Sequence, residues 1–122
     1  MKKVLFIFSF LFIFGSTFSQ QRAFPTDDDA RVYLQDRWFS NSSMGLRITF
    51  GYISVYNTFG LIVKNKNDAE FFYINVKFDS YGNYATVSGM SPEDGRDFGF
   101  NLYKEKLIVG EGQDGEAVFY QE

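Results

Sequence analysis

Three carboxylates stand close together in one loop and are the residues of this chain most suited to acid–base chemistry. Glu93, Asp94 and Asp97 fall in or beside the turn-forming segment 91–95, which contains one proline and one glycine. A pair of carboxylates can act as general acid and general base, as in glycoside hydrolysis. Loops of this composition usually connect strands, with their charged side chains in water. We therefore expect no catalytic role for these residues unless another carboxylate faces them across a deep cleft.

The sequence contains few of the residue types that act in catalysis or bind metals. The chain has no histidine and no cysteine, so the commonest general base and the strongest nucleophile are missing. Thiolate and imidazole metal sites are excluded for the same reason, which leaves oxygen-held cations such as calcium. The consecutive Asp27, Asp28 and Asp29 lack the spacing and the glycine of a calcium loop, and fit the first turn of a helix instead. The sequence predicts a protein that is not an enzyme, without a cofactor or metal site.

Aromatic side chains are the stronger indication of function. After residue 19 the chain carries ten phenylalanines, eight tyrosines and one tryptophan. Strand alternation assigns six phenylalanines to the core: Phe50, Phe59, Phe72, Phe78, Phe98 and Phe100. Side chains in turns, on opposite faces or after the helix are candidate ligand contacts, because tyrosine and tryptophan combine an apolar ring with a polar group. These candidates are Trp38, Tyr56, Tyr73, Tyr81, Tyr84 and Tyr103. The alternative is ordinary cross-strand packing.

The N-terminal segment has the features of a cleavable secretory signal. Lys2 and Lys3 precede an apolar run from Val4 to Phe14, and small residues then lead to a cleavage point at Ser19-Gln20. We expect residues 1–19 to be removed and residues 20–122 to form one domain. The short basic start is typical of bacterial signals, so the expected location is the periplasm or the cell exterior. An uncleaved anchor is the alternative, although a membrane span needs about 20 apolar residues.

The net charge of the chain limits the classes of partner that it can bind. Without Lys2 and Lys3, ten basic residues face fifteen acidic ones, a net charge of −5. No basic cluster exists, so nucleic acid and anionic membranes are unsuitable partners.

The elements follow from hydrophobic periodicity. Ala30, Tyr33, Leu34 and Trp38 recur at helical spacing, which predicts a helix over 27–37. Six or seven short strands follow, with apolar residues at every second position and turn residues between them. The strongest strand spans 69–78, with Phe72, Ile74, Val76 and Phe78 on one face and Phe71, Tyr73, Asn75 and Lys77 on the other.

The fold class predicted is mainly β (α+β), an antiparallel meander that begins with one helix. A helix of eleven residues is about 16 Å long and covers roughly three strands. The other strands must bury their apolar faces in another way. Curling into a small up-and-down barrel achieves this, with the helix closing one end. An open curled sheet, or a dimer, would also bury them.

This arrangement resembles small secreted lipocalin-like (calycin-type) proteins. The resemblance is carried by Leu34 and Trp38 and by the strand that begins with Gly45-Leu46-Arg47. Asp36-Arg37-Trp38 stands where that family often has Gly-x-Trp, so the glycine is missing. The resemblance implies an up-and-down barrel that holds small apolar ligands.

Two functional hypotheses follow. The first is a secreted, non-enzymatic binding module for a small hydrophobic ligand or a glycan. The second is an envelope protein with an interaction or structural role. It rests on Phe71 and Tyr73, which would make one strand apolar on both faces and supply a surface for a protein partner or a homodimer.

Overall fold

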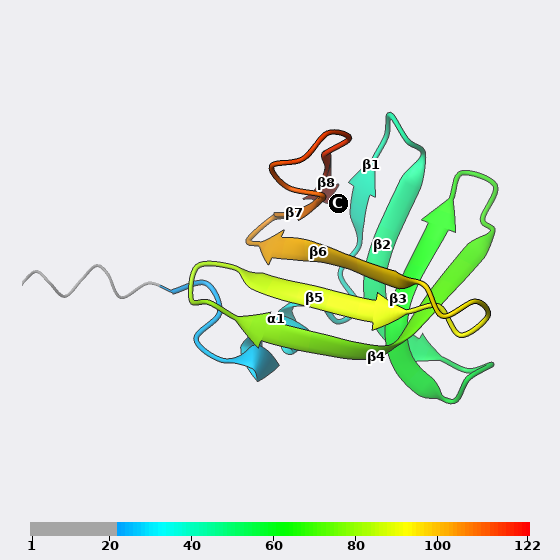
Figure 1. Ribbon diagram of the computed structural model, residues 1–122, viewed down its shortest axis with the longest axis horizontal. Coiled ribbons are helices and arrows are strands. Elements are labelled where there is room, and N and C mark those ends of the chain that lie inside the picture. The colour runs from blue at the N-terminus through cyan, green and yellow to red at the C-terminus, as the bar shows by residue number, and fades with distance from the viewer. Residues whose placement is uncertain (1–21) are drawn as a thin grey trace, which may run out of the picture.

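The chain folds into a closed antiparallel barrel of eight strands preceded by one helix, as the computed structural model of residues 22–122 shows (Figure 1). Each strand pairs with its neighbour in sequence, and the last strand returns to the first. The elements are α1 (Asp27–Leu34), β1 (Phe39–Asn41), β2 (Leu46–Ile53), β3 (Thr58–Asn65), β4 (Glu70–Ser80), β5 (Ala85–Met90), β6 (Asp97–Tyr103), β7 (Lys106–Val109) and β8 (Ala117–Gln121). The predicted mainly β meander is confirmed. The predicted signal, residues 1–19, lies outside the described residues.

Helix α1 begins where predicted and ends three residues early. Thr26 caps it by accepting a hydrogen bond from the backbone N–H of Asp29, and the Asp29 carboxylate accepts from the Thr26 N–H in return. The expected end at residue 37 is wrong because Asp36 adopts a positive φ of 63°. This conformation turns the chain, and the Asp36 N–H then donates to the Phe50 carbonyl of β2 at 3.0 Å.

The strand that closes the barrel is the one that alternation did not predict. β1 has only three residues and runs directly into turn-forming residues, so it is too short to show a period of two. Phe39 is its buried residue and pairs with Ile48 of β2 on one side and Gln121 of β8 on the other. The barrel therefore has eight strands, where the sequence predicted six or seven.

A β-bulge in β4 changes which residues face inward. The pairing of β4 with β5 shifts by one residue between Ile74 and Lys77, and Asn75 has a φ of 55°. Phe71 and Tyr73 therefore pair with the inward-facing Val63 and Leu61 of β3. Beyond the bulge, the residues packed against the core are Val76 and Phe78. The predicted faces are correct after the bulge and inverted before it.

The inversion corrects two predictions. Phe72 was expected in the core, yet it shares the outer face with Ile62, its partner on β3. Tyr73 was expected on the outer face, yet it packs against the core. Phe59 is also not a core residue, since 45% of it is exposed. Phe50 and Phe100 are buried as expected, and Phe78 and Phe98 pack partly buried against them.

The two ends of the barrel differ. The covered end is crossed by α1, below the strands in Figure 1, and is filled by the buried side chains of Phe24, Ala30 and Leu34. The open end lies at the opposite side, where the β1–β2 turn, the start of β4 and the β7–β8 loop meet. Within residues 22–122, no helix has the length and apolar character needed to cross a membrane.

Candidate functional site

An apolar pocket of 310 Å³ occupies the open end of the barrel, and we call it the lumen pocket. Its floor is formed by core residues, among them Ile48 and Phe119. Met44 and Phe71 stand at its mouth, 53% and 52% exposed. The other lining residues are Leu46, Val63, Tyr73, Phe98, Val109, Gly115 and Ala117. The volume lies at the lower limit of ordinary small-molecule sites, which start at about 300 Å³.

Tyr73 is the residue of the lumen pocket with a polar group to offer. Its ring stacks on Phe98 with centroids 4.8 Å apart. Gly89 on β5 makes room for it, because a Cβ there would lie 3.1 Å from the Tyr73 Cβ. Among the described residues, no hydrogen bond is recorded for the Tyr73 hydroxyl group. A ligand that lies on the apolar floor therefore has this hydroxyl as a partner for one polar atom.

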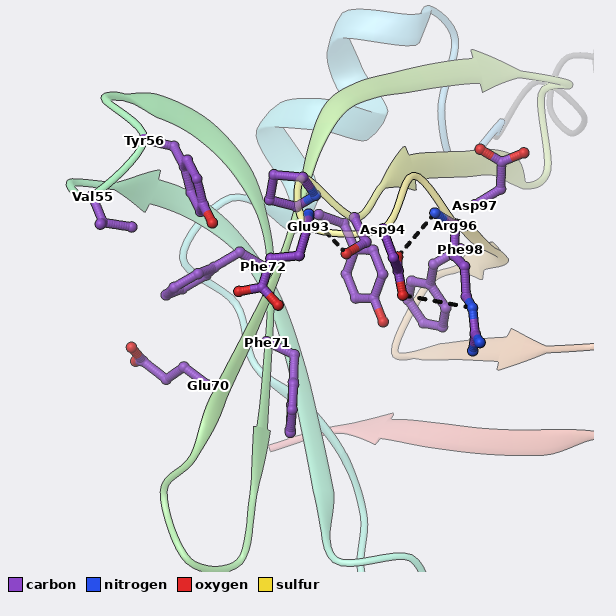
Figure 2. A pocket seen from close by; sticks show the side chains of 13 residues that line it. Val55, Tyr56, Glu70, Phe71, Phe72, Glu93, Asp94, Arg96, Asp97 and Phe98 are labelled. Carbon is purple, nitrogen blue, oxygen red and sulfur yellow. Dashed lines mark hydrogen bonds and ion pairs between the residues drawn. The ribbon is translucent and has the colours of Figure 1, made fainter.

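A second pocket, of 580 Å³, adjoins the first through the wall of the barrel, and we call it the side pocket. Phe71, Tyr73 and Phe98 line both pockets. The side pocket lies between the start of β4, the β2–β3 turn and the β5–β6 loop (Figure 2). In Figure 2, Phe72 points toward Tyr56 of that turn, and their rings meet edge to face at 6.1 Å.

The three carboxylates of the β5–β6 region line the side pocket and are all exposed. Asp94 accepts a hydrogen bond from the Arg96 N–H at 3.1 Å and lies 3.6 Å from the Arg96 guanidinium. The backbone hydrogen bond from Arg96 is the main reason that the pKa of Asp94 falls below its usual value. A general acid at neutral pH needs a raised pKa, so the lowered pKa of Asp94 does not suit that role. Glu93 and Asp97 complete the acidic rim of the pocket.

Three of the predicted tyrosines come together, but on the outer wall away from both pockets. Tyr81, Tyr84 and Tyr103 form a stacked row with centroid distances of 5.3 and 5.5 Å. The Tyr103 hydroxyl donates to Glu111 of the β7–β8 loop at 2.8 Å, and this bond raises the pKa of Tyr103 to about 12. Tyr81 remains 62% exposed, but the row lines neither the lumen pocket nor the side pocket.

Trp38 is also separate from the pockets. The Arg47 guanidinium lies 4.2 Å from its ring centroid, and the Lys64 ammonium lies 5.6 Å away. Arg47 in turn binds Glu122 through two hydrogen bonds of 2.6 and 3.0 Å, the main cause of the lowered pKa of Glu122. The indole therefore serves the contact between β2 and the end of the chain.

The predicted site is thus only partly assembled, since Tyr73 and Tyr56 reach the pockets and the other four candidates do not. Sequence reasoning missed Met44, Val109 and Ala117 as pocket residues. Alternation places Val109 and Ala117 on inward faces, yet it does not show that the space beside them is unfilled. In residues 22–122, no three acidic side chains converge as metal ligands would.

Comparisons with known proteins gave no significant match. No protein-family model matches the sequence, and neither the curated proteins nor the solved structures include a significantly similar chain. Function must therefore be argued from the two pockets and the strands around them.

Proposed function

We propose that this protein is a non-enzymatic binding module that holds a small hydrophobic molecule in the lumen pocket. The supporting observation is the unfilled apolar space of 310 Å³ above a solid core. Burial of apolar surface is worth about 25 cal/mol per Å², so an apolar ligand gains free energy by covering Phe71 and Met44. The signal-like N-terminal sequence supports export, so we propose that the protein acts in the periplasm or outside the cell.

A hydrophobic ligand is favoured over a glycan by the placement of the tyrosines. Protein sites for sugars use exposed aromatic faces together with polar side chains. Here the row of Tyr81, Tyr84 and Tyr103 is self-stacked on the outer wall, and the lumen pocket is lined almost wholly by apolar residues. Tyr73 can fix the orientation of a ligand that carries one polar group.

Fluorescence titration with N-phenyl-1-naphthylamine, an uncharged dye that brightens in apolar surroundings, tests the proposal. Ala117→Phe would place a phenyl ring in the pocket and should weaken dye binding at least about tenfold. Val32→Phe is the matched control, because it adds the same ring on the exposed surface of α1, where Val32 is 57% exposed. Equal dye binding by both variants, or no dye binding by the wild-type protein, would overturn the proposal.

A further inference from the structure

Among the strands of residues 22–122, the first four residues of β4 have a neighbour on one side only. Glu70–Tyr73 pairs with β3, whereas β5 pairs with β4 from Ile74 onward and ends at Met90. Beyond Met90 the β5–β6 loop turns away, held by a hydrogen bond from the Ser91 N–H to the Arg96 carbonyl. The side pocket fills the space that a further strand would otherwise occupy (Figure 2).

The backbone groups that face this space can be identified from the register. The Asn65 N–H donates to the Ala69 carbonyl at 3.1 Å, which makes this a hydrogen-bonded pair. Such pairs alternate along an antiparallel ladder, so Phe71 and Tyr73 also bond to β3. Glu70 and Phe72 therefore direct their N–H and C=O groups toward the side pocket. Within residues 22–122, no hydrogen bond is recorded for these four groups.

The edge has neither proline nor lysine, two residues that often block strand addition. Proteins protect exposed edges with proline, lysine or a covering segment. The sequence of this edge is Glu70-Phe71-Phe72-Tyr73, with three aromatic residues in four positions. Phe71 lies toward the lumen and Phe72 lies on the outer face, so a strand added here would find an apolar side chain on each face.

Charge determines which strand fits. Four carboxylates line the side pocket, those of Glu70, Glu93, Asp94 and Asp97. Arg96 is the one basic residue in its lining and is paired with Asp94 at 3.6 Å, while Lys64 lies 3.6 Å from Glu70. A second copy of this chain would bring the same acidic edge and loop into contact with themselves. An extended segment with basic side chains is complementary to this pocket.

We propose that the Glu70–Tyr73 edge of β4 binds an extended peptide segment of a partner protein in which basic and apolar residues alternate. The segment adds one short strand to the barrel, about 13 Å long at 3.3 Å per residue. Its backbone bonds to Glu70 and Phe72, as in other cases of strand addition. Its apolar side chains contact Phe71 or Phe72, and its basic side chains lie against the acidic rim.

Fluorescence anisotropy with a labelled heptapeptide of alternating lysine and valine tests the proposal. Two matched ligands have the same sequence with N-methyl groups on the valines or on the internal lysines. Their charge is unchanged, and one of them lacks the N–H groups that face β4. Each net hydrogen bond is worth about 1 kcal/mol, so the peptide that loses the two bonds to the Glu70 and Phe72 carbonyls should bind at least about tenfold more weakly. Equal binding of all three peptides would show attraction by charge alone and overturn strand addition, as would no binding of the unmodified peptide.

A pair of protein variants tests the same edge, with the peptide left unmodified. Glu70→Pro removes an N–H that faces the side pocket and leaves the bonds of β4 to β3 intact, which is where proline is tolerated in a sheet. Glu70→Gln removes the same charge and keeps the N–H. Because one hydrogen bond of about 1 kcal/mol is lost, the heptapeptide should bind Glu70→Pro about fivefold more weakly than Glu70→Gln. Equal affinities, with equal circular dichroism spectra, would overturn the proposal.

The tests of peptide binding are independent of the proposed binding of a hydrophobic ligand in the lumen pocket. Ala117→Phe fills the lumen pocket without changing the backbone of the β4 edge, so it should weaken dye binding at least about tenfold and leave the heptapeptide affinity unchanged. Dye binding without peptide binding would therefore reject only the strand-addition proposal, and the reverse result would reject only the lumen-pocket proposal.

Discussion

The covered end and the open end of the barrel use the same kind of residues with opposite results. At the covered end, α1 lies across the strands, and Ala30 and Leu34 are fully buried. At the open end no element of residues 22–122 covers the lumen, and Met44 and Phe71 remain about half exposed. The same apolar chemistry therefore stabilises the fold at one end and leaves an accessible pocket at the other.

The buried core is gathered under the capping helix and between the strands. The continuous core runs from Phe24 to Phe119 and contains all of the largest fully buried side chains. Apolar surface at the open end contributes little to folding, because water still reaches it. Residues there are free to be selected for a ligand, whereas residues under α1 are constrained by packing.

The largest expected effect on the free energy of unfolding comes from a variant at the covered end, compared with one at the open end. Leu34→Ala removes a fully buried side chain from the covered end and should lower the free energy of unfolding by about 2–5 kcal/mol. Phe71→Ala removes a larger side chain from the open end, where half of it is exposed, and should cost at most about 1 kcal/mol. Urea denaturation measures both values. Equal losses of unfolding free energy in the two variants would mean that the open end stabilises the fold as much as the covered end does, which would contradict the difference argued above.

A smaller loss of unfolding free energy is expected from a change at Thr49, which contacts the segment that follows α1. Thr49 is 3% exposed, and its hydroxyl donates to the Arg37 carbonyl, which fastens the segment after α1 onto β2. Thr49→Val keeps the shape and removes the donor, so it should cost about 1 kcal/mol. The same denaturation experiment, with Thr58→Val as a half-buried control on β3, measures the cost. A loss in Thr49→Val no greater than in the control would show that this bond does not help to hold the covered end.

The sequence revealed the covered end more fully than the open end, for physical reasons. Capping at Thr26 to Asp29 and helical spacing from Ala30 to Leu34 are local signals, and they located the helix. The β4 bulge depends on a positive φ at Asn75 and on pairing with β5, so alternation alone inverted Phe71 and Phe72. β1 is too short to show a period. The lumen pocket is space that no side chain fills, and the pattern of residues along a strand does not predict where such space remains.

The Arg47–Glu122 pair on the outer wall belongs to neither end and should contribute less than either buried group. Its side chains are 39% and 36% exposed, and exposed pairs are worth at most about 1 kcal/mol. Because hydrogen bonding to Arg47 lowers the pKa of Glu122 in the folded state, the pair stabilises the fold above the ordinary glutamate pKa of 4.5. This contribution is lost as the pH falls through the lowered value. The stability difference between wild-type protein and Glu122→Gln should therefore be largest near neutral pH and vanish in acid. A difference that persists or grows in acid would contradict this assignment.

The smallest effect on stability should come from the anchor of the β7–β8 loop, which contributes Gly115 to the lumen pocket. Glu111 of this loop accepts hydrogen bonds from the Tyr103 hydroxyl at 2.8 Å and from the Asn101 amide at 2.9 Å. These bonds lower the pKa of Glu111, and the bond to Glu111 is the main reason that the pKa of Tyr103 rises from 10.0 to about 12. A raised tyrosine pKa stabilises the folded state below pH 10, and the contribution is lost as the pH rises toward 12.

Glu111→Gln removes the charge and keeps a hydrogen-bond acceptor. Titration of carbon-13-labelled tyrosine by NMR should show the pKa of Tyr103 returning toward 10. If the loop is held as the structure shows, the same variant should loosen it and alter dye binding at the open end, with little change in the unfolding free energy. An unchanged Tyr103 titration would mean that Glu111 does not anchor the loop in solution. The open end would then be bounded by its strands alone, and the contrast with the helix-covered end would be greater still.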